Sequence, residues 1–280
     1  MPKPPSSPQS APGQQALEQA MMAFQMGRPD EAERIASGVL KANRGNILAA
    51  QILGRALLMQ NRADEAIEPL RRARKRSEDA NIETVLASAL ISIGQRDEAL
   101  DLLRQTVKRQ PPFLPAFAEL GRELGKDGTF DEAIAVLERG LALAPDSPDL
   151  RMTLGHVHIK RNDRKTARAL FMQVRTAAPE RYDALVGLAQ VMALDGEYAA
   201  AADLYKRAVA VQPDDALTRI NLAKCLLELG DRDGGEAALR TAARTTPMAG
   251  RAMTALAAAP HGKFFIRPSD AAKFLRDGKR

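Results

Sequence analysis

The chain has 280 residues, of which 27% are charged and 45% hydrophobic, and these proportions are typical of a folded globular protein and exclude a wholly disordered one. Aromatic residues make up only 4%, so the core has to be built from Ala, Leu, Val and Met, which favours packed helices over a β-sandwich. One cysteine and three histidines exclude a disulfide framework and a multi-cysteine zinc site, and no apolar run approaches the roughly 20 residues that span a bilayer.

Residues 1–12 are rich in Pro, Ser and Gln, and we expect them to form a flexible leader. They contain no apolar segment followed by a cleavage site, and no N-terminal cysteine that could accept a lipid. The leader is therefore not expected to be a secretory signal, and a cytoplasmic location is the default expectation.

Residues 13–249 contain a repeat. The tripeptide Asp-Glu-Ala begins at residues 30, 64, 97 and 131, with spacings of 34, 33 and 34, and Ala167, Ala201 and Gly235 continue the same phase. Seven small residues stand twelve positions before these anchors, and prolines end the later repeats: Ala20, Gly54, Ala87, Gly121, Gly155, Ala189 and Ala223, then Pro111, Pro145, Pro179, Pro213 and Pro247. Seven repeats in phase are not a product of chance.

Each repeat is predicted to be two helices joined by a turn. In the fourth repeat, Phe117, Leu120 and Leu124 recur at helical spacing, and Gly128 can take the positive φ that a tight turn needs. Asp131 then begins a second helix, where an acid suits the helix dipole, and Pro145 ends it. The small residues are explained if the paired helices cross closely at Gly121 and Ala133.

The fourth repeat has Leu120, Gly121, Leu124, Phe130, Ala133, Leu137 and Pro145, and residues 182–215 have Leu188, Ala189, Gly196, Tyr198, Ala201, Tyr205 and Pro213. This pattern closely resembles the tetratricopeptide repeat (TPR) family over residues 13–249. The resemblance implies an all-α fold, a right-handed α-solenoid of tandem helix-turn-helix repeats whose inner wall is lined by the first helix of each repeat. The chain departs from the family at Gln19, where Leu is expected, at Arg44 and Glu78, where Pro is expected, and at Glu83, where Trp is common.

Two segments follow the repeats. Residues 250–260 are expected to form a helix that caps the end of the array. Residues 261–280 form a basic tail with six Lys and Arg against two Asp, and a short helix is predicted at Asp270–Asp277. This helix could fold back on the last repeat, dock on another protein, or belong to a linker toward a further domain.

A search for catalytic chemistry finds no motif. Gly121–Lys126 has three residues between Gly and Gly-Lys where a phosphate loop needs four, and it falls within a repeat helix. His156 and His158 are two residues apart on a helix and point in different directions, so they cannot share a metal, and His158 is expected to be a hydrogen-bonded core residue. Cys225 is expected to be a structural, partly buried thiol. We therefore expect no catalytic residue, no metal and no cofactor, and the chain is not predicted to be an enzyme.

The predicted binding surface is the groove of the solenoid. The family resemblance puts positions 2, 5, 9 and 12 of each first helix on the concave wall, and no acid occurs at position 9 in any repeat. The predicted groove residues are mildly basic or amide-bearing and stand at position 9, except for Asn221 at position 6 and Lys126 and Lys160 at position 13: Arg55, Arg122, Lys126, His156, Lys160, Gln190, Asn221 and Lys224. They could be ordinary solvated side chains, or they could bind an extended, acidic segment of a partner protein. The function predicted first is a non-catalytic interaction scaffold or adaptor that binds an extended, acidic segment of a partner protein in this groove.

Two other functions remain open. TPR arrays of bacterial transferases are similar to this one, so the chain could be a regulatory or substrate-recruiting module of a larger or associated transferase. Nucleic acid could bind the basic tail, but aromatic side chains for base stacking are scarce, and the sequence argues against nucleic acid as the partner. No membrane span and no small-molecule cofactor are expected.

Overall fold

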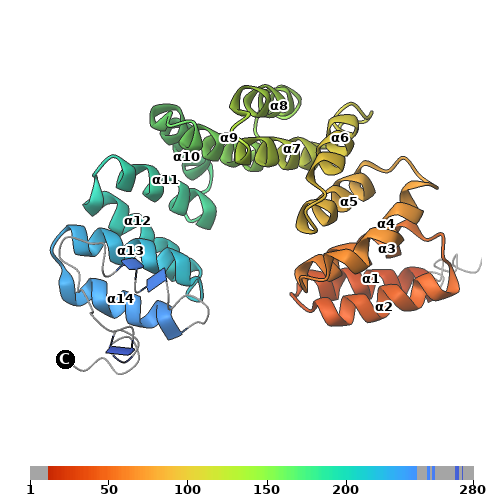
Figure 1. Ribbon diagram of the computed structural model, residues 1–280, viewed down its shortest axis with the longest axis horizontal. Coiled ribbons are helices and arrows are strands. Elements are labelled where there is room, and N and C mark those ends of the chain that lie inside the picture. The colour runs from red at the N-terminus through yellow and green to blue at the C-terminus, as the bar shows by residue number, and fades with distance from the viewer. Residues whose placement is uncertain (1–11, 245–250, 253, 256–268, 271–272, 274–280) are drawn as a thin grey trace, which may run out of the picture. The chain divides into compact units, whose positions relative to one another are not determined.

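The computed structural model describes residues 12–244 together with residues 251–252, 254–255, 269–270 and 273. Within residues 12–244 the chain forms fourteen α-helices and no strand, two helices for each of the seven predicted repeats (Figure 1). The helices are α1 Pro12–Gln25, α2 Pro29–Ala42, α3 Ile47–Met59, α4 Ala63–Arg74, α5 Ala80–Ser92, α6 Arg96–Thr106, α7 Leu114–Lys126, α8 Phe130–Leu143, α9 Pro148–Lys160, α10 Arg164–Ala177, α11 Tyr182–Leu194, α12 Tyr198–Val211, α13 Ala216–Glu228 and α14 Arg232–Arg244. The predicted all-α class is confirmed.

The chain divides into two compact bodies. The N-terminal body contains α1 to α7 and residues 135–145, which include the second part of α8, and the C-terminal body contains residues 128–134 and α9 to α14. In each body, helices that follow one another in the sequence pack together, and first helices of successive repeats also touch, as α3 does with α5 and α9 with α11. Such contacts between sequence neighbours define an α-solenoid.

The small residues lie where the helices of a repeat cross. A Cβ atom added to Gly121 would lie 2.5 Å from Cγ of Leu137, and one added to Gly155 would lie 2.5 Å from Cε1 of Phe171. Ala133 is fully buried. Larger side chains at these positions would force the paired helices apart, as the sequence predicted. The turn residue Gly128 has φ +80°, and Asn61 occupies the matching left-handed position of the second repeat.

Two departures from the family pattern have physical explanations. Gln19 is exposed and lines a pocket against α2, where a polar side chain can be solvated, whereas its equivalent Leu120 is fully buried. Glu83 is buried where the family has Trp, and its carboxylate bonds Arg109 and Thr106 of the same repeat. A paired charge there replaces an aromatic contact.

Beyond α14, residues 251–252 and 254–255 are helical, and Ala252 and Ala255 are buried in a cluster that includes Leu227 and Leu239. The rest of the predicted cap, residues 250, 253 and 256–260, lies outside the described residues, as does most of the tail, including all of its predicted helix at 270–277 except residues 270 and 273. Among the helices that the structure does describe, none has the length and apolar character needed to cross a bilayer.

Candidate functional site

A pocket of about 610 Å³ lies in the C-terminal body between the first helices of the last two repeats. Helices α11 and α13 form its walls, and α12 provides two tyrosines. The lining residues are Val186, Gln190, Ala193 and Leu194 of α11, Tyr198 and Tyr205 of α12, Leu217, Asn221, Lys224, Cys225 and Glu228 of α13, and Ala255. Three of the eight predicted groove residues, Gln190, Asn221 and Lys224, are therefore brought together in one pocket.

The polar side chains of the pocket keep their hydrogen-bonding capacity for a ligand. Gln190 and Asn221 are half-buried, and Lys224 is exposed. None of the three side chains makes a hydrogen bond or ion pair with another residue of the described chain. Asn221 and Lys224 are three residues apart and lie on the same side of α13. Two amides and one ammonium group are thus available along the pocket.

The apolar side chains of the pocket are partly open to solvent. Leu194 is 46% exposed and Leu217 is 45% exposed, whereas Tyr205 and Cys225 are buried. Burial raises the pKa of the Cys225 thiol to about 11, and it also raises the pKa of the Tyr205 hydroxyl, so both groups are neutral near pH 7. The pocket has a neutral floor, with Lys224 as its cation and Glu228 as its anion.

The apolar half of this pocket was not predicted from the sequence. Leu194 occupies the repeat position at which Lys126 and Lys160 stand in earlier repeats, and Leu217 occupies the position of Asp183. The signal was present in the repeat frame as two separate changes, Lys160 to Leu194 between the fifth and sixth repeats and Asp183 to Leu217 between the sixth and seventh.

The other predicted residues of the C-terminal body lie outside the pocket. His156 is exposed, its Nδ1 lies 2.8 Å from the carbonyl oxygen of Met152, and its ring meets the Phe171 ring edge-on at 5.1 Å. Lys160 is exposed at the end of α9. His158 is buried with its Nδ1 3.1 Å from Oδ2 of Asp163, as expected of a core histidine.

In the N-terminal body the predicted groove cations already have partners. Arg55 is half-buried and donates a 2.9 Å hydrogen bond to Oδ1 of Asn81, and burial lowers its pKa. Arg122 pairs with Glu119, and Lys126 pairs with Glu123. Both acids stand three residues before their cations on α7, a spacing that is visible in the sequence.

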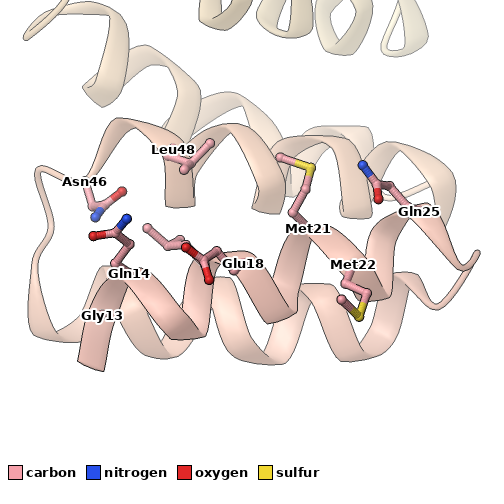
Figure 2. A pocket seen from close by; sticks show the side chains of 9 residues that line it. Gly13, Gln14, Glu18, Met21, Met22, Gln25, Asn46 and Leu48 are labelled. Atoms are coloured by element: carbon pink, nitrogen blue, oxygen red, sulfur yellow. The ribbon is translucent and has the colours of Figure 1, made fainter. Parts of the chain in front are cut away.

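A second pocket, also of about 610 Å³, lies in the N-terminal body between α1 and the start of α3 (Figure 2). Its lining consists of methionines, leucines and amides together with one glycine and one glutamate: Gly13, Gln14, Leu17, Glu18, Met21, Met22, Gln25, Asn46 and Leu48. Figure 2 shows the amides of Gln14 and Asn46 pointing toward one another at one end, and Met21 and Met22 lying farther along α1. This pocket contains none of the predicted groove residues.

No group of three or more His, Cys, Asp or Glu side chains suitable for holding a metal ion occurs among the described residues.

Comparison with known proteins supports the repeat assignment. Family models for the tetratricopeptide repeat match residues 23–87, 84–148, 126–191 and 192–259. A thermophilic TPR protein from Thermus thermophilus has a similar structure, with a TM-score of 0.59 and 23% identity, and the match covers 64% of this chain and 98% of that one. At this identity the likeness shows the fold alone.

Two curated relatives are protein O-mannosyl-transferases TMTC1. The human protein is 30% identical over 188 residues, which cover 65% of this chain and 21% of that protein. The mouse protein is 26% identical over 162 residues, which cover 54% of this chain and 17% of that protein. This chain therefore spans about a fifth of the length of these relatives. The matching family models extend over most of the sequence, so the chain belongs to the tetratricopeptide repeat family, whose repeats suggest a protein-interaction module.

Proposed function

We propose that the chain is an interaction scaffold whose C-terminal body binds an extended segment of a partner protein in the pocket between α11 and α13. The observation that supports this most strongly is the presence of two half-buried amides, Gln190 and Asn221, that make no hydrogen bond within the described chain and line a partly apolar pocket.

The amides suit a peptide backbone. Each has a carbonyl oxygen that accepts and an NH₂ group that donates, so one amide can bond both the N–H and the C=O of an extended residue. An extended segment leaves these backbone groups unpaired, whereas a helical one uses them internally. Gln190 and Asn221 therefore favour an extended ligand.

The remaining lining residues define the ligand's side chains. Leu194, Leu217 and Tyr198 offer apolar surface for one aliphatic or aromatic side chain, and Lys224 offers a cation for one carboxylate. Glu228 stands four residues beyond Lys224 and would repel a second acid. The proposed ligand is an extended segment with an apolar residue next to a single acid, a narrower class than a generally acidic segment.

Selection from a random peptide library displayed on phage tests this proposal. Enriched peptides should share an apolar residue beside Asp or Glu, and titration calorimetry should show at least tenfold weaker binding to the double variant Gln190→Ala, Asn221→Ala. The matched control is Gln25→Ala with Gln212→Ala, two exposed amides outside the pocket. Equal binding by wild type and the pocket variant would refute the proposal.

A second candidate function rests on the relatives. The chain resembles the TMTC1 proteins over more than half of its length while spanning a small part of theirs, so the repeats could recruit substrates to an associated transferase. In that case, a transferase should co-purify with the tagged full chain from native cells, and its recovery should fall with the Gln190→Ala, Asn221→Ala variant. A scaffold that works without an enzyme would bring down no transferase.

A further inference from the structure

A cationic edge lies in the N-terminal body at the C-terminal ends of α2, α4 and α6 and in the loops that follow them. It consists of the exposed residues Lys41, Arg44, Lys75, Arg76 and Lys108. None of these five side chains forms an ion pair with a described residue, in contrast to Arg71 and Arg72 nearby, which pair with Glu98 and Glu68. We call this set the cationic edge.

Contacts between the loops make the edge continuous. The guanidinium of Arg76 lies so close to Gly45 that a Cβ atom there would collide with it, which brings the loop after α4 against the loop after α2. Arg109, which follows Lys108, pairs with Glu78 of the loop after α4. The three loops thus form one row, although they are separated by more than thirty residues in the sequence.

The acids of this row are already engaged. Glu78 is paired with Arg109, and Asp79 caps α5 by accepting hydrogen bonds from the backbone N–H groups of Asn81 and Ile82. The five cations therefore have little compensation from neighbouring carboxylates.

Two of the corresponding loops of the C-terminal body have the opposite character. Where the first three repeats have Lys41, Lys75 and Lys108, the fifth and sixth have Thr176 and Ala210, and the seventh has Arg244. The loops of the fifth and sixth repeats contain Pro followed by acids: Glu180 after Pro179, and Asp214 and Asp215 after Pro213. Arg44 itself stands where the family has Pro.

Helix stability does not explain the difference. Cations at a helix C-terminus do stabilise the helix dipole, but α12 has no basic residue in its last turn and forms a helix of fourteen residues. The loops of the cationic edge also contain the N-termini of α3 and α5, whose dipoles oppose those of α2 and α4. Stabilisation of the helix dipoles therefore does not account for the five cations of the edge.

We infer that the cationic edge binds the phosphate backbone of double-stranded nucleic acid without reading its sequence. Binding through phosphates alone is driven by release of condensed counterions, and it needs several free cations in a row and no apolar anchor. The cationic edge provides such a row of five cations that form no ion pair with a described residue. The scarcity of aromatic side chains disfavours base stacking by the basic tail, but phosphate binding by this row of cations needs no stacking.

Other anionic polymers fit the edge less well. An acidic protein segment has a lower charge density than a duplex, so it releases fewer counterions, and stable protein interfaces need an apolar centre. Leu48 is an exposed apolar residue near these loops, but it lines the pocket of Figure 2. Single strands bind by base stacking on aromatic rings, and the aromatic residues of the N-terminal body, Phe24, Phe113 and Phe117, are not exposed.

Fluorescence anisotropy of the full chain with a labelled DNA duplex of about 20 base pairs tests the inference. If all five cations contact phosphates, the logarithm of the binding constant should fall with the logarithm of salt concentration with a slope of about −4.5, a loss of roughly 500-fold between 50 and 200 mM salt. The triple reversal Lys41→Glu, Lys75→Glu, Lys108→Glu should weaken binding by more than tenfold at 50 mM salt and reduce the slope by about 3.

The matched control reverses three exposed lysines of the C-terminal body, Lys160→Glu, Lys165→Glu and Lys206→Glu, and it changes the net charge equally. It should bind the duplex within about threefold of wild type, and Lys→Arg changes at the edge should preserve binding. Equal losses in both triple variants, or loss only after removal of residues 261–280, would overturn the assignment to this edge. Tighter binding to poly-L-glutamate than to the duplex would overturn the choice of nucleic acid.

Discussion

The carboxylate of Glu83, with 1% of its surface exposed, receives two hydrogen bonds from the guanidinium of Arg109, one of 2.9 Å from Nη2 and one of 3.3 Å from Nε. Thr106 donates a third hydrogen bond of 3.0 Å, and Nε of Arg74 lies 3.6 Å from the same carboxylate. Glu83 belongs to α5 and Arg109, which is half-buried, follows α6, so this pair joins the start of the third repeat to its end.

Removing Arg109 should destabilise the N-terminal body. Arg109→Ala leaves a buried carboxylate with only Thr106 and the more distant Arg74, and breaking one side of such a pair costs about 3 kcal/mol. Urea unfolding at pH 7 measures the loss. Arg72→Ala is the control, because Arg72 forms an exposed pair with Glu68 and should cost less than about 1 kcal/mol. Equal costs would show that the Glu83 pair is not coupled to the fold.

Stability should depend on pH through Glu83. Burial alone would raise the pKa of Glu83, but the hydrogen bonds from Arg109 and Thr106 and the charges of Arg109 and Arg74 outweigh it, and the pKa is lowered. A lowered folded-state pKa contributes stability above the unfolded value of about 4.3, and that contribution disappears as the pH falls through the folded value.

The Glu83→Gln variant isolates this effect. It should be less stable than wild type at pH 7, and the difference should narrow as the pH falls below about 4, because both chains then present an uncharged group to Arg109. Urea midpoints across this pH range measure the gap. If the difference in stability between wild type and Glu83→Gln does not change with pH, the destabilisation is caused by altered packing and not by loss of the charge.

The close helix crossing of the fourth repeat predicts a steric penalty. Gly121→Leu would push against Leu137 and should cost roughly 1–3 kcal/mol. Ala133→Leu should cost a similar amount, whereas Gln95→Leu, at an exposed turn, should change the unfolding free energy much less. Thermal melts of the three variants compare these costs, and similar losses at all three sites would contradict the repeat frame.

Lys224 should determine the preference for an acid in the ligand. Lys224→Glu should weaken binding of an acid-containing selected peptide by at least tenfold and should leave binding of the same peptide with Asp replaced by Asn almost unchanged. Lys206→Glu provides the control, since Lys206 is exposed on α12 outside the pocket. If both peptides lose affinity equally, Lys224 acts through the shape of the pocket.

The basic tail should be dispensable for folding. In a solenoid each repeat is stabilised by its neighbours, so removing residues 261–280 should leave the melting temperature of the remaining chain close to that of the full chain. A much lower melting temperature would mean that Phe274 and Leu275 pack against the core. Circular dichroism of both chains as a function of temperature provides the measurement.

The sequence alone was sufficient for the repeat architecture. The Asp-Glu-Ala anchors, the small residues at Gly121 and Ala133 and the turn at Gly128 each report a local requirement of backbone or helix crossing that recurs every 33 or 34 residues. Each local signal is weak by itself, but together they are strong, because a chance match would have to recur at the same position in all seven repeats. For the same reason the first-helix positions of Gln190, Asn221 and Lys224 could be read from the frame.

Only the tertiary structure decided which of these side chains remain available. Arg122 and Lys126 are paired with acids one helical turn away, whereas Gln190 and Asn221 make no hydrogen bond or ion pair within the described chain. The position of a residue in the repeat does not specify its side-chain rotamer, so the sequence could not distinguish these cases. The pocket needs Leu194 and Leu217 from different repeats, and the cationic edge needs loops after three different helices. Both depend on distances between residues far apart in the sequence, which helix packing sets and which periodicity along one chain does not specify.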